Sequence, residues 1–67
     1  MNAYNQMVEI LRDYTGSSKK ESKELLDNAI KQIKSYPDIH YADYILALDD
    51  LGLPHSYTNL LIKIVEG

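Results

Sequence analysis

The sequence lacks cysteine, tryptophan and phenylalanine, and it has only three glycines and two prolines among 67 residues. Without cysteine, the chain can form no disulfide, no thiolate metal site and no thiol nucleophile. All six aromatic residues are tyrosines, whose hydroxyl favours the edge of a core or a surface that binds a partner. A chain this short buries only about 60% of the surface that its unfolded form exposes. We therefore expect one thin core in one domain, residues 1–67.

The charges are distributed unevenly along the chain. Residues 1–37 carry six basic and five acidic side chains, whereas residues 38–67 carry one basic and five acidic side chains. An acidic surface repels phosphate backbones and anionic lipid headgroups, and it favours a basic partner. The longest apolar run, residues 44–48, is too short to cross a bilayer, and the N-terminus lacks the pattern of an export signal. We therefore expect a cytoplasmic protein without a membrane partner.

Apolar residues recur at helical spacing in four segments that turn signals separate. The predicted helices span residues 2–14, 19–35, 39–51 and 56–66. Gly16 suits the left-handed residue that closes the first helix, and Ser18 with Glu21 has the pattern of a capping box at the start of the second. Pro37 ends the second helix, and Asp38 can cap the third. On the second helix, the predicted buried stripe consists of Leu25, Leu26, Ala29, Ile30 and Ile33.

The turn after the third helix has a clear stop signal. Gly52 suits the left-handed position, Leu53 is expected to fold back on the preceding turn, and Pro54 prevents continuation. Ser56 is the expected cap of the last helix. No segment has the alternation of a strand, so the predicted fold is all-α, a compact bundle of four short helices joined by tight turns. The small core leaves a homodimer open as a second source of stability.

The third helix is apolar around most of its circumference, which indicates either a central position or a second contact surface. The predicted buried arc of this helix consists of Tyr41, Tyr44, Ile45, Leu48 and Leu51. Ile39 and Leu46 lie among aspartates on the opposite side. Asp49 and Asp50 stand near the C-terminal end, where they oppose the helix dipole at a cost of up to about 1 kcal/mol without a partner. A local rule broken in this way often marks a functional site. A lysine from another helix would be an equally good explanation.

The six tyrosines divide into two sets. Tyr4, Tyr14 and Tyr57 fall on regular apolar stripes and are predicted to lie in the core. The other three lie beside aspartates around the third helix, where rigid aromatic area combined with carboxylates suits a basic partner. The predicted partner-binding surface consists of Tyr36, Asp38, Ile39, Tyr41, Asp43, Tyr44, Leu46, Asp49 and Asp50.

Catalytic and metal-binding patterns find little support in the sequence. The three glycines are isolated, so they form no phosphate-binding loop. His55 and Ser56 are adjacent in a turn and define no nucleophile and base. His40, Asp43 and His55 can be drawn together as metal ligands, but a structural zinc site needs four closely specified ligands. We expect no catalytic residue, no cofactor and no metal.

A helix-turn-helix is the alternative that the organisation of residues 39–66 raises. In that interpretation the chain is a dimeric DNA-binding regulator whose last helix enters the major groove. That helix, however, offers Lys63 as its one basic residue, and the sequence pI is about 5.1. The electrostatic pattern of a DNA-binding domain is therefore missing, and nucleic acid is disfavoured as a partner.

Protein binding is the function that the sequence favours. In size, negative charge and helical content, the chain resembles small bacterial immunity proteins and phage-encoded inhibitors that occupy a basic surface of an enzyme. The resemblance implies a small acidic binding module of the inhibitor or immunity type, and it transfers no residues to this chain.

Overall fold

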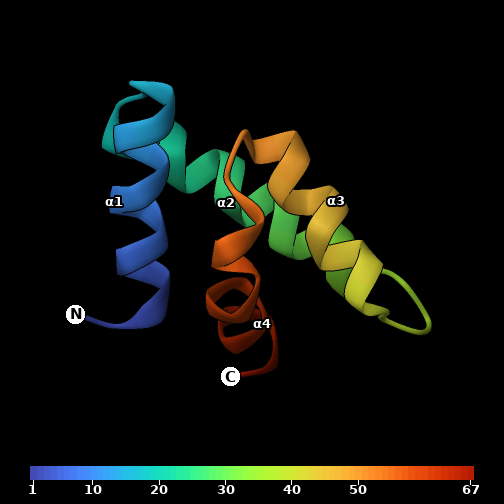
Figure 1. Ribbon diagram of the computed structural model, residues 1–67. Helices are drawn as coiled ribbons and strands as arrows, with labels where there is room; N and C mark the ends of the chain where they lie inside the picture. The colour runs from blue at the N-terminus through green and yellow to red at the C-terminus, as the bar shows by residue number, and fades with distance from the viewer.

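The computed structural model describes all 67 residues and contains four α-helices and one short 3₁₀ helix (Figure 1). The elements are α1 (Ala3–Thr15), α2 (Lys19–Lys34), α3 (Tyr41–Leu51), η1 (His55–Tyr57) and α4 (Thr58–Glu66). No strand is present, and the predicted all-α fold of four short helices is confirmed. None of the helices has the length and apolar character needed to cross a membrane.

The first turn has the predicted caps. Gly16 adopts a left-handed conformation with φ of 70°, and its backbone N–H donates to the carbonyl of Arg12 at 2.8 Å. The hydroxyl of Ser18 accepts the backbone N–H of Glu21 at 3.1 Å and donates to the carboxylate of Glu21 at the same distance. These bonds replace hydrogen bonds that the helix ends cannot make internally.

The predicted start of the third helix at Ile39, with Asp38 as its cap, is wrong. The helix begins at Tyr41, and His40 precedes it in an extended conformation. The carboxylate of Asp43, in the first helical turn, accepts the backbone N–H of His40 at 2.8 Å. Because this carboxylate comes from within the helix and reaches back to His40, it fixes the start there and leaves Ile39 in the preceding loop.

In the turn between α3 and α4, the predicted helix stop at Gly52 and Leu53 is confirmed, but the predicted start of the last helix is not. Gly52 is left-handed with φ of 75°, and the backbone N–H of Leu53 donates to the carbonyl of Leu48 at 2.9 Å, so that Leu53 folds back into the core. The predicted cap at Ser56 is wrong, because residues 55–57 form the 3₁₀ turn and α4 begins at Thr58. The hydroxyl of Thr58 donates to the carbonyl of His55, which ties the two elements together.

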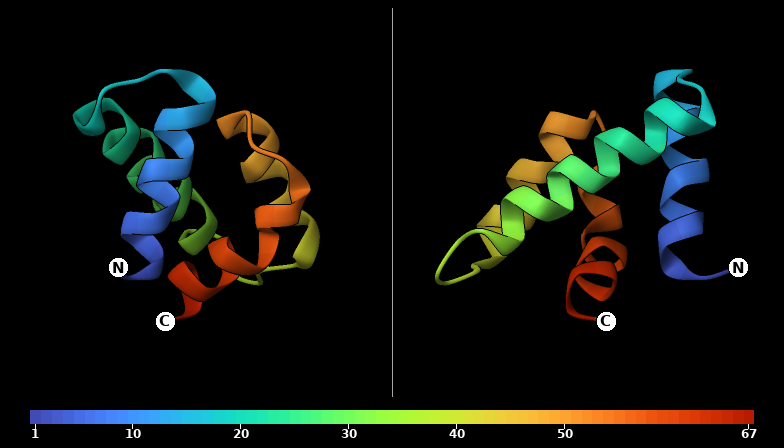
Figure 2. Two further views of the ribbon diagram at one scale, coloured as in Figure 1. Left: turned by 60° about the vertical axis from the view of Figure 1, so that its left-hand side comes forward. Right: turned by 180° about the vertical axis from the view of Figure 1, so that it is seen from behind.

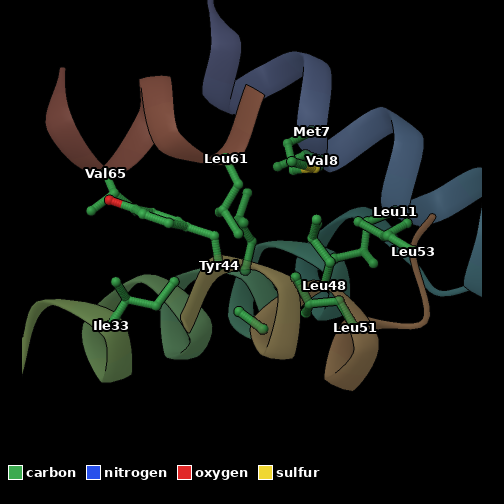
Figure 3. Packing of buried hydrophobic residues seen from close by; sticks show 12 residues of the cluster. Met7, Val8, Leu11, Ile33, Tyr44, Leu48, Leu51, Leu53, Leu61 and Val65 are labelled. Atoms are coloured by element: carbon green, nitrogen blue, oxygen red, sulfur yellow. The ribbon is translucent and has the colours of Figure 1, made fainter. Parts of the chain in front are cut away.

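The helices surround one core. α2 and α3 lie side by side and run in opposite directions, joined by residues 35–40, and α4 contacts α1, α2 and α3 (Figure 2). Every α-helix contributes to the cluster of buried apolar side chains (Figure 3). The cluster consists of Met7, Val8, Leu11, Leu26, Ile33, Tyr44, Ala47, Leu48, Leu51, Leu53, Leu61 and Val65.

Three residues predicted on buried stripes lie at the surface: Tyr14, Leu25 and Tyr41. Tyr14 is exposed, and its ring packs edge-on against the ring of Tyr57, with centroids 5.9 Å apart and an interplanar angle of 78°. Leu25, predicted on the buried stripe of α2, is also exposed. Tyr4 and Tyr57 are partly buried, and the hydroxyl of Tyr4 donates to the carboxylate of Asp27 at 2.7 Å, which links α1 to α2.

The hydroxyl of Ser22 generates a prediction about stability. Ser22 is fully buried in α2, and its hydroxyl has no hydrogen-bond partner. A buried polar group without a partner is destabilising, and alanine has the higher helix propensity, so Ser22→Ala should raise the free energy of unfolding by about 1 kcal/mol. Urea denaturation measures the change. Ser18→Ala, which removes a helix cap, should lower the same quantity by about 1 kcal/mol. A loss of stability in Ser22→Ala would contradict this account of its hydroxyl.

The contact between Tyr4 and Asp27 generates a second prediction, about alkaline pH. Burial, and then the hydrogen bond to Asp27 and its negative charge, raises the pKa of Tyr4 from 10.0 to about 12. The unfolded chain therefore releases this proton first, and stability should fall as the pH rises from about 10 to about 12. Tyr4→Phe should be about 1 kcal/mol less stable at neutral pH. Its stability should then fall less steeply between about pH 10 and about pH 12. Urea midpoints across that range measure the slope, and equal slopes in both proteins would refute the assignment.

Candidate functional site

A groove of about 340 Å³ runs between α2 and α3. One wall carries residues of α2 at the spacing of a single helix face together with Tyr36 just beyond its end, and the other wall carries residues of α3 at the same spacing. The groove is lined by Leu25, Asn28, Ala29, Gln32, Ile33, Tyr36, Asp43, Leu46, Ala47, Asp50 and Leu51. We call this feature the α2–α3 groove.

The α2–α3 groove has a buried floor and an exposed apolar rim. Ile33 and Leu51 belong to the core and close the groove from below. On the rim, Leu25 is 43% exposed, Tyr36 is 38% exposed and Leu46 is 61% exposed. Three large apolar side chains therefore gather on one hollow of the surface. Such a gathering marks a contact site more often than apolar residues that are scattered singly.

All charged side chains that line the groove are negative. Asp43 and Asp50 lie on the α3 wall, and the polar residues of the α2 wall, Asn28 and Gln32, are neutral. No lysine, arginine or histidine lines the groove. The apolar rim is thus accompanied by two carboxylates without a basic residue among them, and this combination attracts a cationic group.

The three aspartates on α3 have different surroundings. One oxygen of Asp43 accepts the backbone N–H of His40, as described above. Asp49 lies outside the groove lining, and its carboxylate contacts Nε2 of His55 at 2.7 Å. Asp50 has no side-chain hydrogen bond and no ion pair. A lysine was the expected partner of these aspartates, but Asp49 contacts a histidine instead. Asp50 has no partner and remains uncompensated at the C-terminal end of α3.

The structure divides the residues of the predicted partner-binding surface. Four of them line the groove: Tyr36, Asp43, Leu46 and Asp50. Another four are exposed but lie outside the groove lining: Asp38, Ile39, Tyr41 and Asp49. Only the part of the predicted surface that faces α2 therefore lines the groove.

Tyr44 was predicted both on the buried arc of the third helix and on the partner-binding surface; the structure confirms the first placement and corrects the second. It is only 6% exposed, and its ring lies between α4 and α2, near Val65 and Ile33 (Figure 3). Burial, followed by the negative charges of Glu66 and Asp43, raises the pKa of its hydroxyl. Tyr44 is part of the core because it points to the same side of α3 as Leu48 and Leu51. It can offer almost no area to a partner.

The α2 side of the groove was missed in the sequence. Leu25, Asn28 and Gln32 line it, and only Leu25 carried a signal. It stands next to Leu26 on an apolar stripe, and the stripe is wider than the face of α2 that the core covers. The excess width was the observable sign of an apolar groove wall on α2.

The other constellations considered in the sequence do not assemble into a site. His55 contacts Asp49 at the C-terminal end of α3, whereas His40 and Asp43 lie at its N-terminal end. No three His, Asp or Glu side chains are grouped so that they could hold a metal ion. α4, the reading helix of the DNA-binding alternative, packs against the three other α-helices and exposes Asn59, Lys63 and Glu66. The geometry adds no support to DNA binding, which stays an untested prediction.

Comparison with protein-family models, with curated proteins and with solved structures gave no match.

The different roles of Asp43 and Asp50 generate a prediction. Asp43→Ala removes the carboxylate that holds the start of α3, so the free energy of unfolding should fall by about 1 kcal/mol. Asp50→Ala removes a charge that opposes the helix dipole and has no partner, so stability should stay unchanged or rise by a few tenths of a kcal/mol. Urea denaturation of both variants distinguishes them. Equal losses would show that Asp50 also has a structural role.

Proposed function

We propose that this chain is a cytoplasmic protein-binding module that occupies a basic surface of another protein through the α2–α3 groove. The observation that carries the proposal is the position of Leu46, which is 61% exposed on the rim of a groove that also contains the uncompensated Asp50. The two side chains combine an apolar contact with a charge of defined sign. Neither Leu46 nor Asp50 makes a contact within the fold that accounts for its position on the rim.

The energetics of a small chain support this proposal. Burying a leucine stabilises a protein by about 1.5 to 3 kcal/mol. A chain with a core of twelve apolar residues has few other sources of stability, yet it leaves Leu25, Tyr36 and Leu46 exposed around one groove. A partner that covers the groove would bury these side chains, and their removal from water would then stabilise the complex. The carboxylates beside these residues then favour a partner with lysine or arginine at matching places.

Inhibition or immunity is the role that we assign to such a binder. A small acidic protein that covers a basic surface blocks access of nucleic acid or of an acidic substrate to that surface. The DNA-binding alternative has no corresponding support, because α4 is committed to packing and its exposed residues include one lysine and one glutamate. A lack of retardation of DNA at low salt would agree with the proposal.

Photo-crosslinking from single positions tests the proposed function. A photoreactive phenylalanine derivative replaces Leu46 in one variant and Tyr41 in a matched control, because both side chains lie on α3 and are 61% exposed, but only Leu46 lines the groove. In the cell of origin, position 46 should capture a protein through a lysine- or arginine-rich segment, and position 41 should capture much less of it.

Charge variants of the crosslinking protein supply the control. Asp50→Lys should abolish the adduct formed at position 46, whereas Asp49→Asn should leave it intact because Asp49 lies outside the groove. The proposed function would be refuted if position 46 formed no adduct. An adduct with an acidic segment would refute it as well.

A further inference from the structure

We propose that the α2–α3 groove binds an amphipathic α-helix of two to three turns that carries lysine or arginine at positions i and i+7 and apolar residues at i+3 and i+4. This inference rests on the proposed function and specifies the partner's chemistry. It follows from the types of recognition that the groove permits, from its dimensions and from the arrangement of its carboxylates.

The architecture of the groove selects a helix as its occupant. The chain has no strand, so a partner cannot bind by extending a sheet. Proline-rich segments bind grooves with several aromatic residues, and this groove has one, Tyr36. Phosphorylated segments require arginine or lysine, and neither lines the groove. Two adjacent helices with a hollow between them instead offer the surface onto which a third helix packs.

The dimensions of the α3 wall set the length of the occupant. Asp43 and Asp50 are seven residues apart on one face of α3, a distance of about 10 Å along the helix axis. Between them lie Leu46 and Ala47. Along about two turns of α3, the wall therefore presents a carboxylate, then two apolar side chains, and then a second carboxylate. On the α2 wall, the helical lining residues run from Leu25 to Ile33, about 12 Å, and Tyr36 follows just beyond the end of the helix, which limits the occupant to roughly three turns.

The sequence of charges on this wall sets the pattern of the occupant. A helix that lies along α3 places its own residues i and i+7 about 10 Å apart, next to Asp43 and Asp50. Its residues i+3 and i+4 then lie between them, opposite Leu46 and over the floor formed by Ile33 and Leu51. Asp50 has both carboxylate oxygens available, and Asp43 has one oxygen that is not engaged by His40. Each can therefore accept a hydrogen bond from a cationic side chain.

The same charges disfavour a second copy of this chain as the occupant. Two copies that shared the groove by a two-fold axis would bring Asp43 and Asp50 of both copies to one interface without a basic residue among the lining side chains. Like charges at an interface raise its free energy. A basic helix removes this repulsion and adds attraction.

Binding of designed peptides tests the inference. The probe is an alanine-rich peptide of about eighteen residues, long enough to form a helix, with two lysines seven positions apart and two leucines at the third and fourth positions after the first lysine. One control peptide has the same composition with the leucines moved to the opposite face, and a second has glutamate in place of both lysines. Backbone amide shifts of the isotope-labelled protein locate the binding site, and a titration of the shifts measures the dissociation constant.

The first peptide should bind and shift the amide signals of residues around Leu25, Leu46 and Asp50, and both control peptides should bind at least tenfold more weakly. Leu46→Gln should weaken binding about tenfold because it removes an apolar contact, and Asp50→Asn should weaken it about threefold at low salt and less at high salt. Asp49→Asn, a neutralisation outside the groove, should change nothing. All three substituted positions are exposed, so the variants should remain folded.

Three results would overturn the inference: no binding of the first peptide, equal binding of all three peptides, or a stable dimer in light scattering that Leu46→Gln dissociates. If crosslinking at position 46 captures a basic partner while the peptide does not bind, the helical occupant is wrong and the proposed function stands. If the peptide binds in the groove while position 46 captures nothing, the inferred geometry stands and the proposed function is wrong.

Discussion

The core of this chain is a single cluster of twelve apolar side chains, to which every α-helix contributes one stripe. With 67 residues and no disulfide, the chain has no second source of comparable stability within itself. α4 depends on this cluster most directly, because Leu61 and Val65 place it against the other three α-helices. The return of the chain at Leu53 depends on it as well, since that residue folds into the cluster after Gly52. The arrangement of α2 beside α3, and with it the groove, follows from how these two helices share the core.

Much of the fold was predictable because its signals are local. Helical spacing of apolar residues, the pair Ser18 and Glu21, and the left-handed glycines at positions 16 and 52 depend on neighbours within a few residues. The start of α3 was misplaced because two carboxylates, Asp38 and Asp43, competed for the capping role. The one inside the helix reaches back to His40, and a sequence pattern does not rank them.

The candidate site was predicted only in part because it depends on contacts between helices. Which side of α3 faces the core decides that Tyr44 is buried while Leu46 is exposed, although both belong to an almost continuously apolar segment. The contribution of α2 to the groove depends on the separation of two helices, and no local pattern encodes that distance. The exposure of Leu46 was predictable because Asp43, Asp49 and Asp50 lie three or four residues away from it and therefore share its helix face.

We propose a separation between apolar residues that hold the fold and apolar residues that are left for a partner. Leu48 and Leu46 represent the two groups on one helix, the first fully buried and the second 61% exposed on the groove rim. The free energy of unfolding of Leu46→Gln beside that of Leu48→Gln tests this separation most directly. We predict that Leu46→Gln stays within about 0.5 kcal/mol of the parent chain and that Leu48→Gln loses about 3 kcal/mol or more. A comparable loss in both variants would show that Leu46 belongs to the core, and it would contradict the existence of a groove kept for binding.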